Sequence, residues 1–194
     1  MTEEAAAQLA HYRVDPAVST FTVRAFAEGL FSVFGHDPIF RVKEFSGEAE
    51  FVPGTFANAS LRLVISTSSL SVTNVSKSDR QEIERTMRNE VLETSKYPEI
   101  VFESHDISLS RIGQDRYRAR VIGDLTLHGV TQKNLCVNGE VIASGAGELR
   151  AKGLCPIKQT DYKIKLVSVA GGTLKVKNEV RCSFDVRWLR LVVT

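Results

Sequence analysis

The sequence predicts an all-β fold, an extended antiparallel β-barrel of about eight strands that one amphipathic helix covers. Apolar and polar residues alternate along most of the chain, most cleanly over residues 116–127 and 180–188. This period of two gives a strand one apolar face and one solvated face. Long strands with a single apolar face can close on themselves, and closure removes the exposed edges of the sheet.

Shorter alternating segments supply the remaining strands. They lie around residues 21–23, 45–51, 61–65, 100–102, 135–141, 149–151 and 164–166. Turn residues separate several of them, at Pro53-Gly54, at 113–115 and at Gly171-Gly172. Asn138-Gly139 is either another turn or a bulge within a strand. About eight strands make a barrel whose interior holds side chains or one small ligand.

One segment has a helical period. Between Lys77 and Glu93, Ile83, Met87 and Val91 recur every four residues beneath a charged face. Ser78 is the expected N-cap, and the pair Tyr97-Pro98 stops the helix because a residue before proline avoids helical geometry. A single amphipathic helix among long strands is expected to cover one end of the barrel.

Composition restricts the function classes. The 194 residues form one domain, expected over 12–190 with a short extension at 1–11, and the net charge of +2 gives no strong attraction for nucleic acid. The longest apolar runs span only a few residues, so no integral membrane segment is expected. Acidic residues near Met1 replace the basic start of a secretory signal, which predicts a cytoplasmic location. A homodimer is compatible with the sequence.

Cysteines and lysines are interpreted as structural residues. Cys136, Cys155 and Cys182 are widely spaced and form no C-x-x-C pair, so all three are expected in the core. The lysines that alternate with apolar residues between 163 and 177 are expected on a solvated strand face, since no aromatic residues interleave with them for nucleic-acid binding. They are Lys163, Lys165, Lys175 and Lys177.

The motifs of enzymes are missing from the sequence. His11, His36, His105 and His128 lie far apart, without metal-ligand or triad spacing, and no dinucleotide-binding glycine motif occurs. We therefore expect no enzyme, no metal and no cofactor. His36 beside Asp37 is the best candidate for a polar contact. The alternative is an enzyme that acts on a small amphiphile with His36 as general base.

Several inward positions are small, which leaves two interpretations of the interior. Small residues can leave an open lumen, or they can relieve crowding in a filled core or in a sandwich of two sheets. A filled barrel would serve as a protein-interaction module with an exposed apolar patch. Alternation alone does not decide between them. The small positions are Gly47, Ala49, Ala119, Gly123, Ala151 and Gly153.

Ordered motifs along the chain resemble the YceI-like family of lipid-binding proteins. The most distinctive are Tyr-Pro-Glu-Ile-Val-Phe-Glu-Ser at 97–104 and Gly-Asp-Leu-Thr-Leu-His-Gly-Val-Thr at 123–131. Tyr-Arg-Val-Asp at 12–15, Gly-His-Asp at 35–37 and the helical segment 79–92 accompany them, so the match spans about 12 to 188. The resemblance implies a lipocalin-like barrel whose lumen takes the tail of a polyisoprenoid or a similar lipid.

The resemblance favours an open lumen, for which the alternation supplies candidate ligand-binding residues. Those expected to line it are Phe21, Val23, Phe26, Phe31, Phe34, Phe51, Leu63, Phe102, Ala119, Val121, Gly123, Leu125, Phe184 and Trp188. His36 and Asp37 are expected at a polar mouth, where they would contact a head group.

Overall fold

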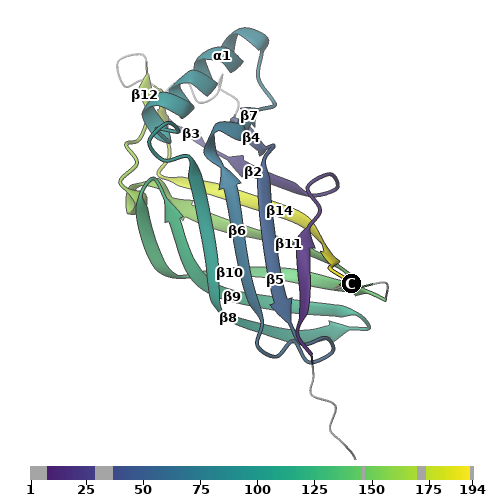
Figure 1. Ribbon diagram of the computed structural model, residues 1–194. Coiled ribbons are helices and arrows are strands. Elements are labelled where there is room, and N and C mark those ends of the chain that lie inside the picture. The colour runs from purple at the N-terminus through teal and green to yellow at the C-terminus, as the bar shows by residue number, and fades with distance from the viewer. Residues whose placement is uncertain (1–7, 29–36, 146, 170–173, 193–194) are drawn as a thin grey trace, which may run out of the picture.

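The computed structural model describes residues 8–28, 37–145, 147–169 and 174–192, and it is mostly β-structure (Figure 1). The strands are β1 (Ala10–Val14), β2 (Thr20–Arg24), β3 (Ala27–Glu28), β4 (Ile39–Val42), β5 (Phe45–Phe51), β6 (Ser60–Ser66), β7 (Leu70–Val72), β8 (Glu99–Gly113), β9 (Arg116–Leu127), β10 (Val130–Ser144), β11 (Glu148–Lys158), β12 (Ser168–Val169), β13 (Leu174–Val176) and β14 (Glu179–Arg190). One α-helix, α1 (Lys77–Thr86), continues into a π-helical turn, Met87–Val91.

Eight strands close into an antiparallel ring, as the sequence predicts. The order is β1-β5-β6-β8-β9-β10-β11-β14, and β14 pairs back with β1. This closing seam sets Val14 opposite Trp188 and Tyr12 opposite Arg190. The seam occupies only one half of β14, because β2 pairs with the other half from Arg181 to Asp185. The strands β4 and β7 follow β2 and extend the sheet toward the helix.

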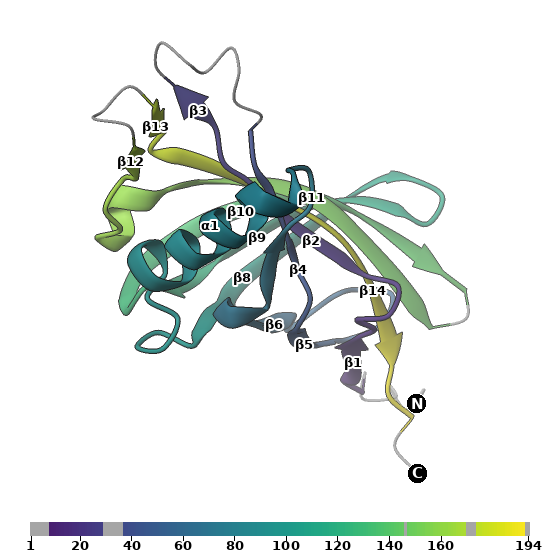
Figure 2. The ribbon, with the colours of Figure 1, turned by 90° about the horizontal axis from the view of Figure 1, so that it is seen from above.

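The helix covers one end of the barrel (Figure 2). Its predicted apolar face, Ile83, Met87 and Val91, borders the interior. Ser76, and not the expected Ser78, is the N-cap: its backbone is extended and its Oγ accepts a hydrogen bond from the Asp79 amide at 3.2 Å. A small sheet, β12-β13-β3, lies at the same end of the molecule.

The pair Asn138-Gly139 is neither a turn nor a bulge. It lies inside β10, where Gly139 pairs with Ala119 on one side and Gly153 on the other. Neighbouring strands on both sides hold the backbone extended, which overrides the local turn preference of Asn-Gly. The irregularity in β10 falls between Gln132 and Leu135 instead. The strand expected at 164–166 is also wrong, because these residues follow a 3-10 turn at Gln159–Tyr162 and run as a loop.

Candidate ligand-binding cavity

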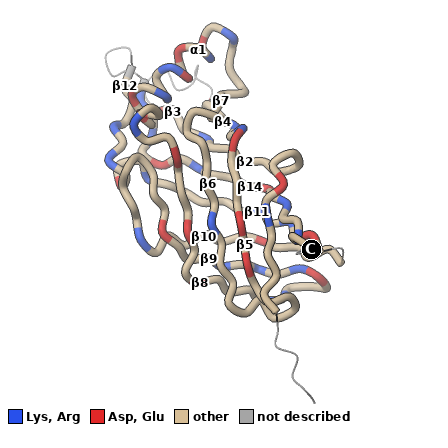
Figure 3. Tube along the Cα trace, viewed as in Figure 1, with Lys and Arg blue, Asp and Glu red and all other residues tan. Residues whose placement is uncertain are grey.

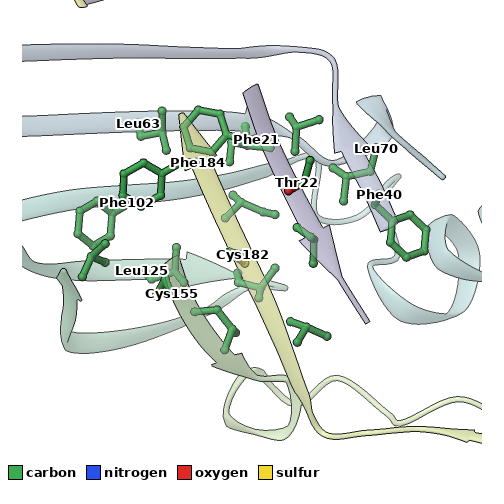
Figure 4. Close-up of a pocket in the computed structure, with 18 of the residues that line it drawn as sticks. Phe21, Thr22, Phe40, Leu63, Leu70, Phe102, Leu125, Cys155, Cys182 and Phe184 are labelled. Carbon is green, nitrogen blue, oxygen red and sulfur yellow. The ribbon is translucent and has the colours of Figure 1, made fainter. Parts of the chain in front are cut away.

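The barrel encloses a cavity of about 1250 Å³. Every ring strand except β1 contributes to its wall, together with β2, β4 and the inner face of the helix. The lining is predominantly apolar, and Figure 4 shows aromatic and aliphatic side chains converging from several strands. The volume exceeds the range of about 300 to 1,000 Å³ that is usual for small-molecule pockets. A long apolar molecule therefore fits this space better than a compact metabolite.

Ten of the residues predicted for the lumen line this cavity. They are Phe21, Val23, Phe51, Leu63, Phe102, Ala119, Val121, Leu125, Phe184 and Trp188. Phe26 lies elsewhere, with the guanidinium carbons of Arg24 and Arg181 each 5.4 Å from its ring centroid. Gly123 is outside the lining because the Phe102 ring covers it. Phe31, Phe34 and His36 lie outside the described residues.

Asp37 forms a local ion pair. Its carboxylate accepts hydrogen bonds from the Arg24 guanidinium at 2.9 and 3.2 Å and from the Ala27 amide at 3.1 Å. These bonds hold the segment before β4 against β2 and β3. The next residue, Pro38, borders the cavity. Asp37 therefore lies next in sequence to a residue of the cavity lining, with Arg24 as its partner.

Aromatic rings occupy the space above glycines in the barrel wall. A Cβ at Gly123 would lie 2.7 Å from the Phe102 ring tip, and one at Gly153 would lie 2.4 Å from that of Phe184. A Cβ at Gly47 would similarly lie 3.0 Å from the Trp188 indole. The missing side chains let these bulky rings lie close to the wall. The glycines that were expected to leave an open lumen do so indirectly. They make room for aromatic rings close to the wall, and these rings would otherwise project farther into the lumen.

The end of the barrel away from the helix is closed by aromatic residues. Tyr12 and Phe51 stack with ring centroids 4.5 Å apart and planes inclined by 13°. Phe56 continues the cluster, 5.1 Å from Phe51 and 5.0 Å edge-on from Tyr117. Tyr12 is 4% exposed and Phe51 6% exposed. This floor gives the cavity a closed, apolar end.

Many polar side chains in the lining lie toward the helix end, although Ser60, Glu140 and Lys152 also border the cavity from β6, β10 and β11. Asn74 is already satisfied, because it bonds the Ile39 amide and the Asp37 carbonyl, and Gln159 bonds the Lys177 carbonyl. Exposed Glu82 on α1 and Lys175 on β13 also border the cavity. Sequence reasoning missed both. The position of Glu82 beside Ile83 in the amphipathic helix could have indicated that Glu82 lies near the cavity. Lys175 could not be predicted in this way, because β13 has only three residues, too few to show an alternating pattern.

A largely buried histidine ties the helix end to the barrel. The His128 side chain is 10% exposed, and its Nε2 lies 2.7 Å from a Glu93 carboxylate oxygen. Its Nδ1 lies 3.2 Å from the Tyr162 carbonyl. With Gly129, His128 forms the β9–β10 turn. The same side chain also joins that turn to the segment that follows the helix.

Two cysteines face the cavity from adjacent strands. Cys155 on β11 stands directly opposite Cys182 on β14, and both border the cavity. Burial raises the pKa of the Cys155 thiol to about 11 and that of Cys182 to about 12. Both thiols are therefore protonated at neutral pH and act as apolar wall. Cys136 is exposed, contrary to expectation, because on β10 its neighbours Leu135 and Val137 take the inward positions.

Comparison with known proteins places the chain in a family. A model of the YceI-like domain matches residues 12–188. The chain belongs to the YceI-like family. No curated protein matched the sequence. Among the described residues of this YceI-like protein, no helix is long and apolar enough to cross a membrane. The same residues contain no group of three His, Cys, Asp or Glu side chains placed to hold a metal ion.

Solved structures share the fold of this YceI-like protein. BcnA of Burkholderia cenocepacia superposes with a TM-score of 0.67 at 20% identity, covering 90% of this chain and 98% of BcnA. A polyisoprenoid-binding domain from Saccharophagus degradans, implicated in plant cell wall breakdown, gives 0.65 at 17% identity and covers 93% and 98%. The YceI protein of Campylobacter jejuni gives 0.58 at 16%, covering 79% and 85%. At these identities the likeness shows the fold.

Adding a methyl group to Gly123 is expected to destabilise the barrel. The new Cβ would lie 2.4 Å from the Glu103 carbonyl oxygen, so backbone as well as the Phe102 ring must shift. We expect Gly123→Ala to lower the free energy of unfolding by about 1 to 3 kcal/mol in urea denaturation. Gly145→Ala is the control, because nothing lies within 4 Å of its Cβ. Equal stability of the two variants would contradict this account of the wall.

The cavity thiols are expected to resist alkylation. With a pKa of about 11 or 12, a thiol at pH 8 is ionised to at most about one part in a thousand. Iodoacetamide at pH 8 should therefore modify the exposed Cys136 and leave Cys155 and Cys182 intact, as read by peptide mass analysis. All three should react once the protein is unfolded in urea. Alkylation of Cys182 at early times in the native protein would instead show that the barrel wall opens and exposes this thiol to the reagent.

Proposed function

We propose that this protein binds the apolar tail of a polyisoprenoid or similar long-chain lipid in the barrel lumen and carries or stores it. The observation that supports this most is the large, apolar cavity closed by aromatic residues at one end and covered by a helix at the other. Burying about 300 Å² of tail would contribute about 7 kcal/mol before the cost of association. Because a tail forms no hydrogen bonds, shape and dryness suffice to hold it.

Relatives support this assignment at family level. The YceI-like family match and the polyisoprenoid-binding domain of Saccharophagus degradans both favour an apolar ligand. They also favour a binding protein over an enzyme. A barrel with a filled core does not fit the cavity, which weakens the protein-interaction alternative. The cytoplasmic location and the homodimer stay predictions.

The described histidines give no support to the enzymatic alternative. Neither His11, His105 nor His128 borders the cavity. His128 is engaged by Glu93 and Tyr162, while His11 pairs with Glu50 at 2.9 Å on the outer surface. A general base must reach the proton that it removes. His36 lies outside the described residues, and its proposed role is a head-group contact.

The lipid head is proposed to lie at the helix end. There Glu82 and Lys175 border the cavity, and Asp37 directly precedes Pro38 of the lining. A head group with donor and acceptor oxygens could bond one of these charged groups while the tail runs toward the floor at Phe51. This orientation leaves the aromatic floor in contact with the tail end.

Native mass spectrometry of the purified protein, followed by organic extraction and mass analysis, tests the carrier function. A stoichiometric polyprenyl species, or uptake of an added polyprenol, is the expected result. Protein that stays free of lipid after incubation with polyprenols would overturn the proposal.

Filling the lumen should abolish binding. Ala119 is 6% exposed on β9 and borders the cavity, so Ala119→Trp places an indole in the path of the tail. We expect at least a tenfold loss of polyprenol affinity, with the fold retained by circular dichroism. Arg118→Trp is the matched control, because Arg118 is the exposed neighbour on the same strand. If Ala119→Trp binds like Arg118→Trp, this part of β9 does not contact the ligand.

A further inference from the structure

A group of exposed lysines surrounds part of the cavity end that the helix covers. We call it the lysine surface; it consists of Lys158, Lys163, Lys165, Lys175 and Lys177. Two segments bring these residues together. The Val176 amide bonds the Val167 carbonyl at 3.0 Å, and Gln159 bonds the Lys177 carbonyl through its side chain at 2.9 Å. Figure 3 shows basic positions gathered near β12 and below α1.

The lysine surface differs from the outer wall of the barrel in how often its basic residues form ion pairs. On the wall, several basic residues pair with carboxylates on neighbouring strands, as Arg116 does with Glu140 at 2.8 Å and Arg150 with Asp185 at 2.7 Å, although Arg111 and Arg118 have no such pair among the described residues. Within the part of the chain that the structure describes, none of the five lysines has a carboxylate within 4.0 Å.

The strand and turn segments that carry these lysines hold fewer acidic residues than lysines. Glu28 stands opposite Lys175 on the neighbouring strand, Asp161 lies in the 3-10 turn, and Glu179 begins β14. All three are exposed. On these segments five ammonium groups therefore outnumber three carboxylates, although the whole chain carries only +2. Glu82 and Glu93 lie at the same end of the barrel, on the helix and on the segment after it.

The lysine surface adjoins the cavity and contains an exposed apolar residue. Ile164, Val167 and Val176, which lie between its lysines in sequence, border the cavity. Leu166, next to Lys165, is 42% exposed. Tyr162, the aromatic residue of this segment, is 2% exposed and cannot offer its ring for stacking on nucleic-acid bases. Basic groups around an exposed leucine match the interface of an anionic bilayer.

We propose that the lysine surface docks on an anionic lipid bilayer and brings the helix-covered end of the cavity to the membrane. This inference rests on the proposed lipid-binding function, because docking there would let an apolar tail pass between bilayer and lumen with little exposure to water. The lysines contact lipid phosphates, while Leu166 enters the boundary between head groups and acyl chains. Each basic residue near such a surface strengthens binding about fivefold.

Vesicle flotation of the full chain tests the docking. Vesicles of phosphatidylcholine alone are compared with vesicles that also contain phosphatidylglycerol. The test variant is the triple substitution Lys163→Gln, Lys165→Gln and Lys177→Gln, which leaves Lys175 at the cavity in place. The control removes the same charge from exposed residues toward the other end of the barrel, by Arg13→Gln, Arg111→Gln and Arg118→Gln.

The expected result is that the protein binds phosphatidylglycerol vesicles, that added salt weakens this binding, and that the lysine variant binds about 100-fold more weakly. The control should keep most of the affinity. Equal loss in both variants, or equal binding to neutral vesicles, would overturn the proposal, since net charge or nonspecific adsorption would then explain the binding.

A separate measurement distinguishes this inference from the lumen function. Polyprenol uptake, read by native mass spectrometry without vesicles, should be the same in the lysine variant and the unmodified protein. If neither takes up polyprenol but vesicle binding still depends on the lysines, the docking holds and the lumen function fails. If both take up polyprenol and neither binds vesicles, the lumen function holds and the docking fails.

Discussion

A ring of eight antiparallel strands encloses about as much space as its own inward side chains can fill, so a hollow interior needs bulky residues to be held against the wall. Here the absence of a Cβ at Gly123 and Gly153 gives Phe102 and Phe184 room close to the backbone. The rings still provide apolar surface, and they leave a cavity of about 1250 Å³ in the centre.

The two ends of this barrel have different chemistry. Phe51 and Phe56 border the cavity at one end and offer a ligand apolar contact, and Tyr12 stacks behind Phe51. At the other end the helix, charged residues such as Glu82 and the His128–Glu93 contact combine cover with polar groups. An amphiphile with one polar head and a long tail matches this asymmetry. The lysine surface continues the polar end outward, so head-group recognition and membrane approach would occur on one side of the molecule.

Long alternating segments made most of the barrel predictable, because a period of two over residues 116–127 leaves little choice of structure. The same period, followed one strand further, would have placed Cys136 outside, since Leu135 and Val137 already hold the inward phase. Short elements were not predictable. The chain at 163–166 alternates by coincidence while a 3-10 turn before it sets the path, and Asp37 is placed by an ion pair with Arg24 from another strand.

The seam between β1 and β14 joins the two ends of the sequence, with Val14 set against Trp188. During synthesis, β1 emerges before every other strand of the ring, and its final partner β14 emerges last of the eight. Contacts between such distant residues slow folding, because a long loop must be ordered before they form. We therefore expect the β1–β14 seam to be the last part of the ring to close.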